Sequence, residues 1–305
     1  MAINDISLTS GMRNNLLSLQ NTATLINQTQ GRLSTGKKVN SALDNPTNFF
    51  AAQTHMERAN DLSNRKDGMS EAIQLVNAAN AGITGITALI QSAQGVASSA
   101  AATSSATDRA NYAATFNTLL NQITQLASDS GYRGTNLLTK QDQTVEFGQF
   151  TGTSTLGITG FNASASGLTI DTASISSAGA TGGLGSINGS SIGGAGMSAT
   201  AWNVSGAAAS VATQVIQSAA SQLENALSTL RTQSSKLSAN LSVVTTRQDF
   251  TNSMINTLQT GADNLTLADM NEEGANMLML QTRQNLGISS LSMASQAAQA
   301  VLKLF

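Results

Sequence analysis

The chain contains no cysteine, and its 305 residues include a single histidine. A disulfide framework, a thiol nucleophile and a zinc site with the usual ligands all need residues that this sequence lacks. Most acid–base constellations depend on histidine and are excluded for the same reason. The sequence therefore predicts that the protein is not an enzyme and binds neither a metal nor a cofactor.

Charge is also scarce, because Asp, Glu, Lys and Arg make up only 10% of the chain and the formal net charge is -2. No basic excess is present to neutralise phosphates, so a nucleic-acid partner is not expected. Uncharged polarity replaces charge, with 27 Asn and 22 Gln. Such a surface favours contact with other subunits, although an ordinary extracellular protein accounts for it equally well.

Long apolar runs are missing as well. Four polar residues, Asp5, Arg13, Asn14 and Asn15, interrupt the first twenty positions, which therefore do not resemble a secretory signal peptide. No uninterrupted stretch approaches the roughly 18 apolar residues of a membrane span. We expect no membrane insertion, and either a cytosolic location or export without a cleaved signal peptide.

Glycine is concentrated in one region. Residues 151–210 hold 13 of the 26 glycines and a single charged side chain, Asp171. Short alternating pieces at residues 144–147 and 168–170 indicate brief strands joined by turns. We expect residues 151–204 to form a small β or irregular insertion with little apolar mass to bury.

On both sides of this region, apolar residues recur every seven positions, which is typical of the seam of a coiled coil. The seam residues are Met69, Val76, Ile83 and Ile90 before the region, and Leu223, Leu230, Leu237 and Val244 after it. A third apolar stripe runs from Tyr112 to Leu126. Helices of this kind bury their stripes only against one another. The predicted fold is mainly α, an elongated coiled-coil-like helical bundle.

Both chain ends carry amphipathic stripes of their own. The N-terminal stripe is Leu8, Met12, Leu16, Leu19, Ile26 and Leu33, and the C-terminal stripe is Met279, Leu286, Met293, Val301 and Leu304. Residues 1–40 carry a net charge of +3 and residues 263–305 a net charge of -2, so the two ends are expected to pair. A two-helix pair leaves apolar surface uncovered, so it should be stable only when several copies pack together.

Turn residues mark the boundaries. Asn45 precedes the single proline, Pro46, which is the arrangement of an N-cap followed by proline at the first helical position. A long helix is therefore predicted to begin at Pro46, and the terminal helix to end near Thr35 and Gly36.

Three short segments carry recognisable motifs: residues 33–42 (Leu-Ser-Thr-Gly-Lys-Lys-Val-Asn-Ser-Ala), residues 131–138 (Gly-Tyr-Arg-Gly-Thr-Asn-Leu-Leu) and residues 269–273 (Asp-Met-Asn-Glu-Glu). They resemble segments of bacterial flagellin, the subunit of the flagellar filament. The likeness covers residues 1–150 and 205–305. Asn45-Pro46 with Phe49-Phe50 is similar to the α-proteobacterial branch of the family.

The resemblance implies a concentric architecture in a polymer. Residues 1–40 and 263–305 would form paired inner helices, residues 41–150 and 205–262 the long-helix bundle with a small hairpin, and residues 151–204 a variable outer segment. It further implies a filament that acts as the propeller for swimming motility, and type III export without a cleaved signal peptide. The implied partners are other copies of the chain, an export chaperone at residues 301–305, and the hook-junction and filament-cap proteins.

One segment departs from the family pattern. Many flagellins present Gln-Arg-x-Arg-Glu-Leu to a Toll-like innate receptor, whereas residues 91–96 here read Gln-Ser-Ala-Gln-Gly-Val. Recognition by that receptor is therefore not expected. Two other functions remain open at this stage: a hook-filament junction protein with the same helical ends, and a surface adhesin whose middle segment binds a ligand.

Overall fold

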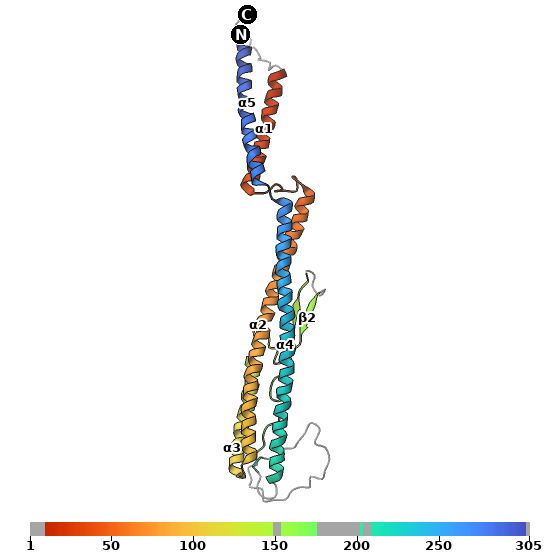
Figure 1. Cartoon of the computed structure of the whole chain (residues 1–305), viewed down its shortest axis with the longest axis vertical. Coiled ribbons are helices and arrows are strands. Elements are labelled where there is room, and N and C mark those ends of the chain that lie inside the picture. The colour runs from red at the N-terminus through yellow and green to blue at the C-terminus, as the bar shows by residue number, and fades with distance from the viewer. Residues whose placement is uncertain (1–9, 149–153, 176–201, 204–208, 303–305) are drawn as a thin grey trace, which may run out of the picture. The chain divides into compact units, whose positions relative to one another are not determined.

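The computed structural model describes residues 10–148, 154–175, 202–203 and 209–302. Within these ranges the chain forms five helices and one two-stranded sheet (Figure 1). The elements are α1 (Ser10–Thr35), α2 (Pro46–Ala102), α3 (Ala106–Asp129), β1 (Gln143–Glu146), β2 (Thr155–Ile158), α4 (Ala209–Thr266) and α5 (Met270–Leu302). The predicted class, a helical bundle with a small β insertion, is confirmed.

The chain divides into two compact units. One unit contains residues 1–60 and 254–305, and the other contains residues 61–253. Helices α2 and α4 each contribute to both units, so the unit boundaries fall inside these two long helices.

The larger unit is the bundle of α2, α3 and α4. The eight seam residues predicted from the seven-residue repeat all lie in its core, each no more than 5% exposed. By length and composition, α2 is the one described helix that could cross a bilayer, and 39% of its most apolar 18-residue window is buried. Its apolar rows pack inside this core, as expected for the central helix of a bundle.

Helix boundaries follow the predicted capping signals. Helix α2 begins at Pro46, and the Asn48 N–H donates to the Asn45 side-chain oxygen at 3.0 Å. Helix α1 ends at Thr35, and Gly36 follows with φ of +68°, a conformation that glycine adopts without a steric penalty. Both predicted boundaries are therefore confirmed.

The small sheet differs in part from the expectation. Strand β1 lies one residue before the predicted position and pairs antiparallel with β2, with Val145 opposite Leu156. Residues 168–170 form no strand. They belong to a turn in which the Leu168 N–H donates to the Ser164 carbonyl at 2.9 Å and Thr169 has φ of +57°.

The described part of the glycine-rich insertion contributes to the core of the bundle. Five of its apolar residues are no more than 6% exposed: Ile158, Ala163, Leu168, Ile170 and Ala173. Trp202 is 1% exposed and packs on Phe116 of α3, with ring centroids 4.9 Å apart. The expectation that this segment has little to bury is wrong for these residues, because they fill positions that the three helices alone leave open.

Candidate assembly surface

Helices α1 and α5 pack side by side, as the opposite charges of the chain ends predicted (Figure 1). The contact is intimate at Gly287, where a β-carbon would lie 2.6 Å from a methyl group of Leu19. One turn further along α5, Ser290 accepts a hydrogen bond of 3.2 Å from the Asn15 amide. A glycine at this position therefore allows the leucine of one helix to seat against the backbone of the other.

An ion pair joins the other end of the two helices. The Arg32 guanidinium lies 3.0 Å from the Glu273 carboxylate, whose side chain is 8% exposed. Glu273 lies in the first turn of α5, whose N-terminus is capped by Asp269 through the N–H groups of Asn271 and Glu272 at 2.8 and 3.3 Å. The acidic first turn thus complements the helix dipole and also binds α1.

The predicted C-terminal stripe lies on the side of α5 that faces away from α1. Met279, Leu286 and Met293 are 53, 67 and 62% exposed. The side turned toward α1 carries Leu280, which is 5% exposed, together with Glu273 and Gly287. These three side chains are therefore more than half exposed in the single chain.

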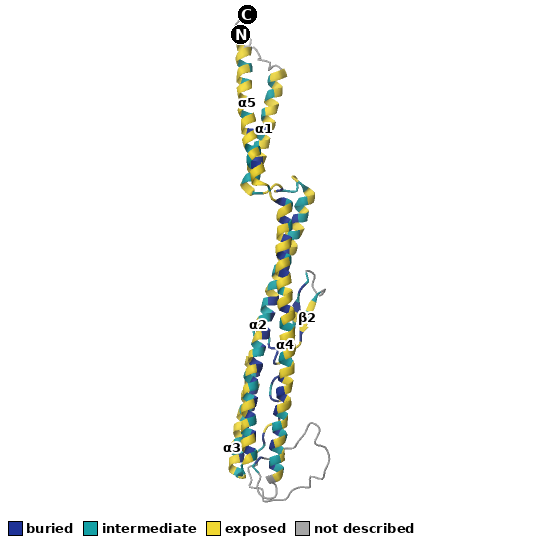
Figure 2. Ribbon diagram, in the orientation of Figure 1, coloured by how far each residue is buried: buried dark blue, intermediate teal, exposed yellow. Residues whose placement is uncertain are grey.

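The N-terminal stripe is only partly covered. Met12, Leu19, Ile26 and Leu33 are of intermediate exposure, whereas Leu16 is 40% exposed and its neighbour Leu17 is 58% exposed. Leu8 and Leu304 lie outside the described residues, and Val301 belongs to α5 without a described side chain. Both terminal helices therefore present large apolar side chains to solvent in the single chain (Figure 2).

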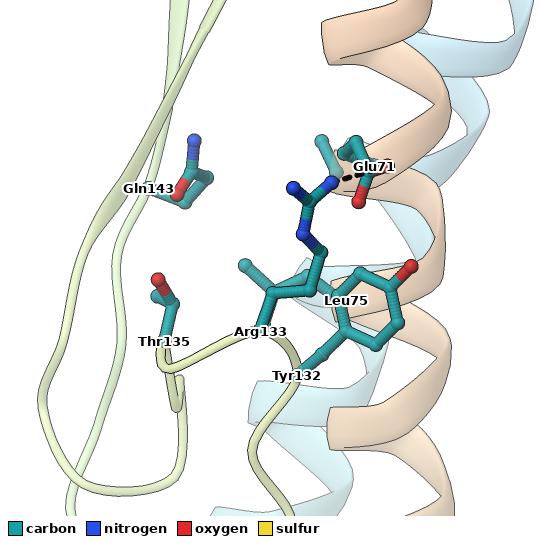
Figure 3. A pocket seen from close by; sticks show the side chains of 7 residues that line it. Glu71, Leu75, Tyr132, Arg133, Thr135 and Gln143 are labelled. Atoms are coloured by element: carbon teal, nitrogen blue, oxygen red, sulfur yellow. Dashed lines mark ion pairs between the residues drawn. The ribbon is translucent and has the colours of Figure 1, made fainter.

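In the larger unit, the turn at residues 132–135 lies against α2 (Figure 3). Tyr132 and Thr135 exchange two backbone hydrogen bonds of 2.8 and 3.0 Å, and Arg133 and Gly134 between them have φ of 49° and 84°. The Arg133 guanidinium reaches the Glu71 carboxylate at 2.7 Å. This hydrogen bond holds the pKa of the Glu71 carboxyl below its ordinary value.

Two arginines from different helices hold the hairpin that follows this turn. Arg65 of α2 forms an ion pair with Glu146, and the Arg247 guanidinium of α4 lies 5.4 Å from the centre of the Phe147 ring. Sequence reasoning missed these contacts, because single arginines on long helices carry no local signal of their distant partners. These two contacts attach the hairpin to helices α2 and α4 of the bundle.

In the part of the chain that the structure describes, no group of three or more His, Asp or Glu side chains that could hold a metal ion occurs. A cavity of about 140 Å³ is lined by Glu71, Leu75, Tyr132, Arg133 and their neighbours (Figure 3). The exposed apolar rows on the paired terminal helices are typical of proteins that assemble with other subunits.

Comparison with known proteins agrees with this class. The profile of the bacterial flagellin N-terminal helical region matches residues 3–143. The flagellins FljO and FljM of Caulobacter vibrioides are each 30% identical to the chain over 306 residues, which cover 100% of both sequences. Flagellin B of Rhizobium meliloti is 44% identical over 59 residues, 19% of this chain and 15% of the relative.

The chain belongs to the bacterial flagellin family and is of the α-proteobacterial type. It is a structural subunit of the flagellar filament, an extracellular appendage. The resemblance found in the three sequence segments is therefore confirmed.

Proposed function

We propose that the chain polymerises through its paired terminal helices, with the outer rows of α1 and α5 as the surfaces that bind neighbouring copies. The observation that carries this proposal is the exposure of Met279, Leu286 and Met293, each more than half exposed. Burying one such side chain contributes roughly 1.5–3 kcal/mol, so a contact that covers the row stabilises the polymer substantially. The same residues bury less than half of their surface in the folded single chain.

The eight seam residues have a different role in this proposal. They hold the bundle together within each copy, while the N-terminal stripe (Met12, Leu16, Leu19, Ile26 and Leu33, with Leu8) shares its surface between α5 and neighbouring copies. Residues 1–40 and 263–305 then form the innermost layer of the filament, the bundle the next layer, and residues 151–204 the outer one.

Membership of the flagellin family also suggests partners other than copies of the chain itself. An export chaperone binds the end of α5 near Val301 before assembly, and the hook-junction and cap proteins contact the polymer at its two ends. Export proceeds through the flagellar type III apparatus without a cleaved signal peptide, and the chain does not insert into a membrane. Residues 91–96 lack the arginines and glutamate that the innate receptor reads, so this chain does not activate it.

Leu286→Asp tests the assembly surface directly. The substitution places an unpaired carboxylate in a row that the polymer would bury, and burying an isolated charge is strongly unfavourable. We expect unchanged circular dichroism for the monomer and no filaments in the electron microscope. Leu286→Met, which conserves volume, and Gln281→Asp, an exposed position on the flank of α5, serve as controls and should polymerise.

Normal filaments from Leu286→Asp would contradict the proposal. That result would mean that the row faces the water-filled channel of the polymer, where the carboxylate stays hydrated. Truncation of residues 1–35 or 270–305 provides a second test, because either change removes one helix of the pair. Each truncated chain should keep a helical bundle and lose polymerisation.

A further inference from the structure

The two segments that connect the terminal helices to the bundle helices are fastened to each other. They are residues 36–45, between α1 and α2, and residues 266–269, between α4 and α5. The backbone hydrogen bonds run from Lys38 N and Val39 N to Thr266 O, at 2.7 and 3.2 Å, and from Ala268 N to Gly36 O, at 3.0 Å. The first connection is therefore held in a defined position.

Side-chain hydrogen bonds fix the rest of this connection. One Asp44 carboxylate oxygen accepts from the N–H groups of Asn40 and Ser41, each at 3.0 Å, and from the Ser41 hydroxyl at 3.2 Å. The N–H of Leu43 donates to that hydroxyl at 3.3 Å. The Leu43 side chain is nevertheless 96% exposed. The turn thus holds a leucine in water at a cost in backbone entropy and with no apolar burial in return.

Charge distinguishes the surroundings of Leu43 from the exposed side of α5. We define the connector corner as Lys37, Lys38 and Leu43, and the outer start of α5 as Glu272, Leu278 and Met279. Both lysines and Glu272 are exposed and form no ion pair within the described ranges. Leu278 is 68% exposed and Met279 is 53% exposed. The connector corner therefore combines one large apolar side chain with positive charge. The outer start of α5 combines two large apolar side chains with negative charge.

We propose that the connector corner of one copy binds the outer start of α5 on a second copy. The two surfaces do not cover each other within one copy, because Leu43 is almost fully exposed there. A contact between two different surfaces of identical chains repeats from copy to copy, and it generates an open helical polymer when the rotation between copies does not close into a ring. The inference rests on the proposed function and deepens it by naming which surface covers the first turns of α5.

The absence of cysteine permits a clean proximity test. Monomers carrying Leu43→Cys and monomers carrying Leu278→Cys are mixed, polymerised and treated with a short bismaleimide. We expect a covalent dimer from this mixture, and at least about tenfold less from Leu43→Cys mixed with Ser292→Cys, an exposed position 14 residues further along α5, about 21 Å. Without polymerisation, both mixtures should remain monomeric.

The thiol at position 43 also reports its own burial. It should react with a bulky maleimide in the monomer and be protected in the polymer. If the wild-type chain forms no polymer, the proposed function fails and this inference fails with it. If polymers form while position 43 stays as reactive as in the monomer, or while both mixtures cross-link equally, only this inference is overturned.

Substitutions at the two surfaces measure the size of the contact. Leu43→Asp should raise the critical concentration for polymerisation about tenfold or more, since a buried leucine contributes roughly that factor to an association constant. Leu43→Met should leave it unchanged. Lys38→Glu should raise the critical concentration at low salt, and adding Glu272→Lys should restore it. Failure of the second change to restore assembly would contradict the pairing of these two surfaces.

Discussion

The three-helix bundle and the pair of terminal helices bury different kinds of residue. In the bundle, the seam residues of α2 and α4 are all apolar and at most 5% exposed, whereas the buried residues of α1 are two threonines, Thr22 and Thr29. Among the described side chains of α5, the buried residues are Glu273 and Leu280. The bundle has a complete apolar core of its own. The terminal pair has little apolar burial, and most of its residues are exposed in the single chain (Figure 2).

This difference explains how one sequence serves two purposes. Isolated pairs of helices are marginal in water, because most helical stability comes from packing of an apolar face. A subunit whose ends are incomplete alone and complete in the polymer can remain monomeric until neighbouring copies meet. The bundle keeps the subunit folded in the meantime. Substitutions that separate the two contributions therefore provide the sharpest tests.

The largest effect is expected from deletion of residues 155–200. The buried apolar residues within this range include Ile158, Leu168 and Ile170, all in the core. Their loss should unfold the bundle or leave it molten, measured by near-ultraviolet circular dichroism and thermal unfolding.

A narrower deletion is the matched control. Removal of residues 178–199 leaves five residues between Ser174 and Trp202, whose backbones are joined by a hydrogen bond of 3.0 Å. A short connection can span ends that lie so close, so folding and filament formation should be retained. Unfolding of this shorter deletion would show that the omitted segment itself stabilises the bundle.

Ile90→Ala and Leu286→Ala compare the two units directly. Ile90 is 0% exposed in the bundle, and its truncation should lower the free energy of unfolding by about 2–5 kcal/mol. Leu286 is 67% exposed, and its truncation should change monomer stability by less than about 0.5 kcal/mol while weakening polymerisation. Urea denaturation of the monomers and sedimentation of the polymers measure the two quantities. Equal losses of monomer stability would contradict the distinction between the units.

Much of this arrangement could be predicted from the sequence, and the reason is local periodicity. The seam row through Ile83 and the boundary at Asn45 depend on residues within one or two turns of each other. The burial of Trp202 and Ala173 depends on distant partners; the Asn117 amide, for example, binds the Ala173 backbone through two hydrogen bonds of 2.7 Å across 56 residues. No repeat in the sequence indicates contacts between residues so far apart in the chain. Similarly, apolarity at Leu286 reveals an apolar face without revealing what covers it.

Two helical glycines offer a smaller test within the bundle. A β-carbon at Gly82 would lie 2.2 Å from the Ser130 hydroxyl oxygen and 2.7 Å from a Leu138 methyl group, whereas one at Gly68 would meet nothing within 4 Å. Gly82→Ala should therefore destabilise the monomer by about 1–3 kcal/mol through overpacking. Gly68→Ala should stabilise it by up to about 1 kcal/mol, because alanine is the better helix former. Thermal unfolding of both variants decides, and destabilisation by Gly68→Ala would contradict the open space seen there.

The smallest expected effect is a pH dependence at the turn that carries Arg133. The hydrogen bond from Arg133 lowers the pKa of Glu71 in the folded chain. A carboxyl group whose pKa is depressed by folding contributes stability that is fully present above its unfolded pKa and is lost as pH falls through the folded value. Glu71→Gln should therefore reduce stability slightly at neutral pH and have no effect at a pH below the folded pKa of Glu71. The half-exposed pair is screened by solvent, so the difference should shrink further in high salt. A loss of stability that persists unchanged in strong acid would show that the glutamine disturbs packing, and that the ion pair is not the cause.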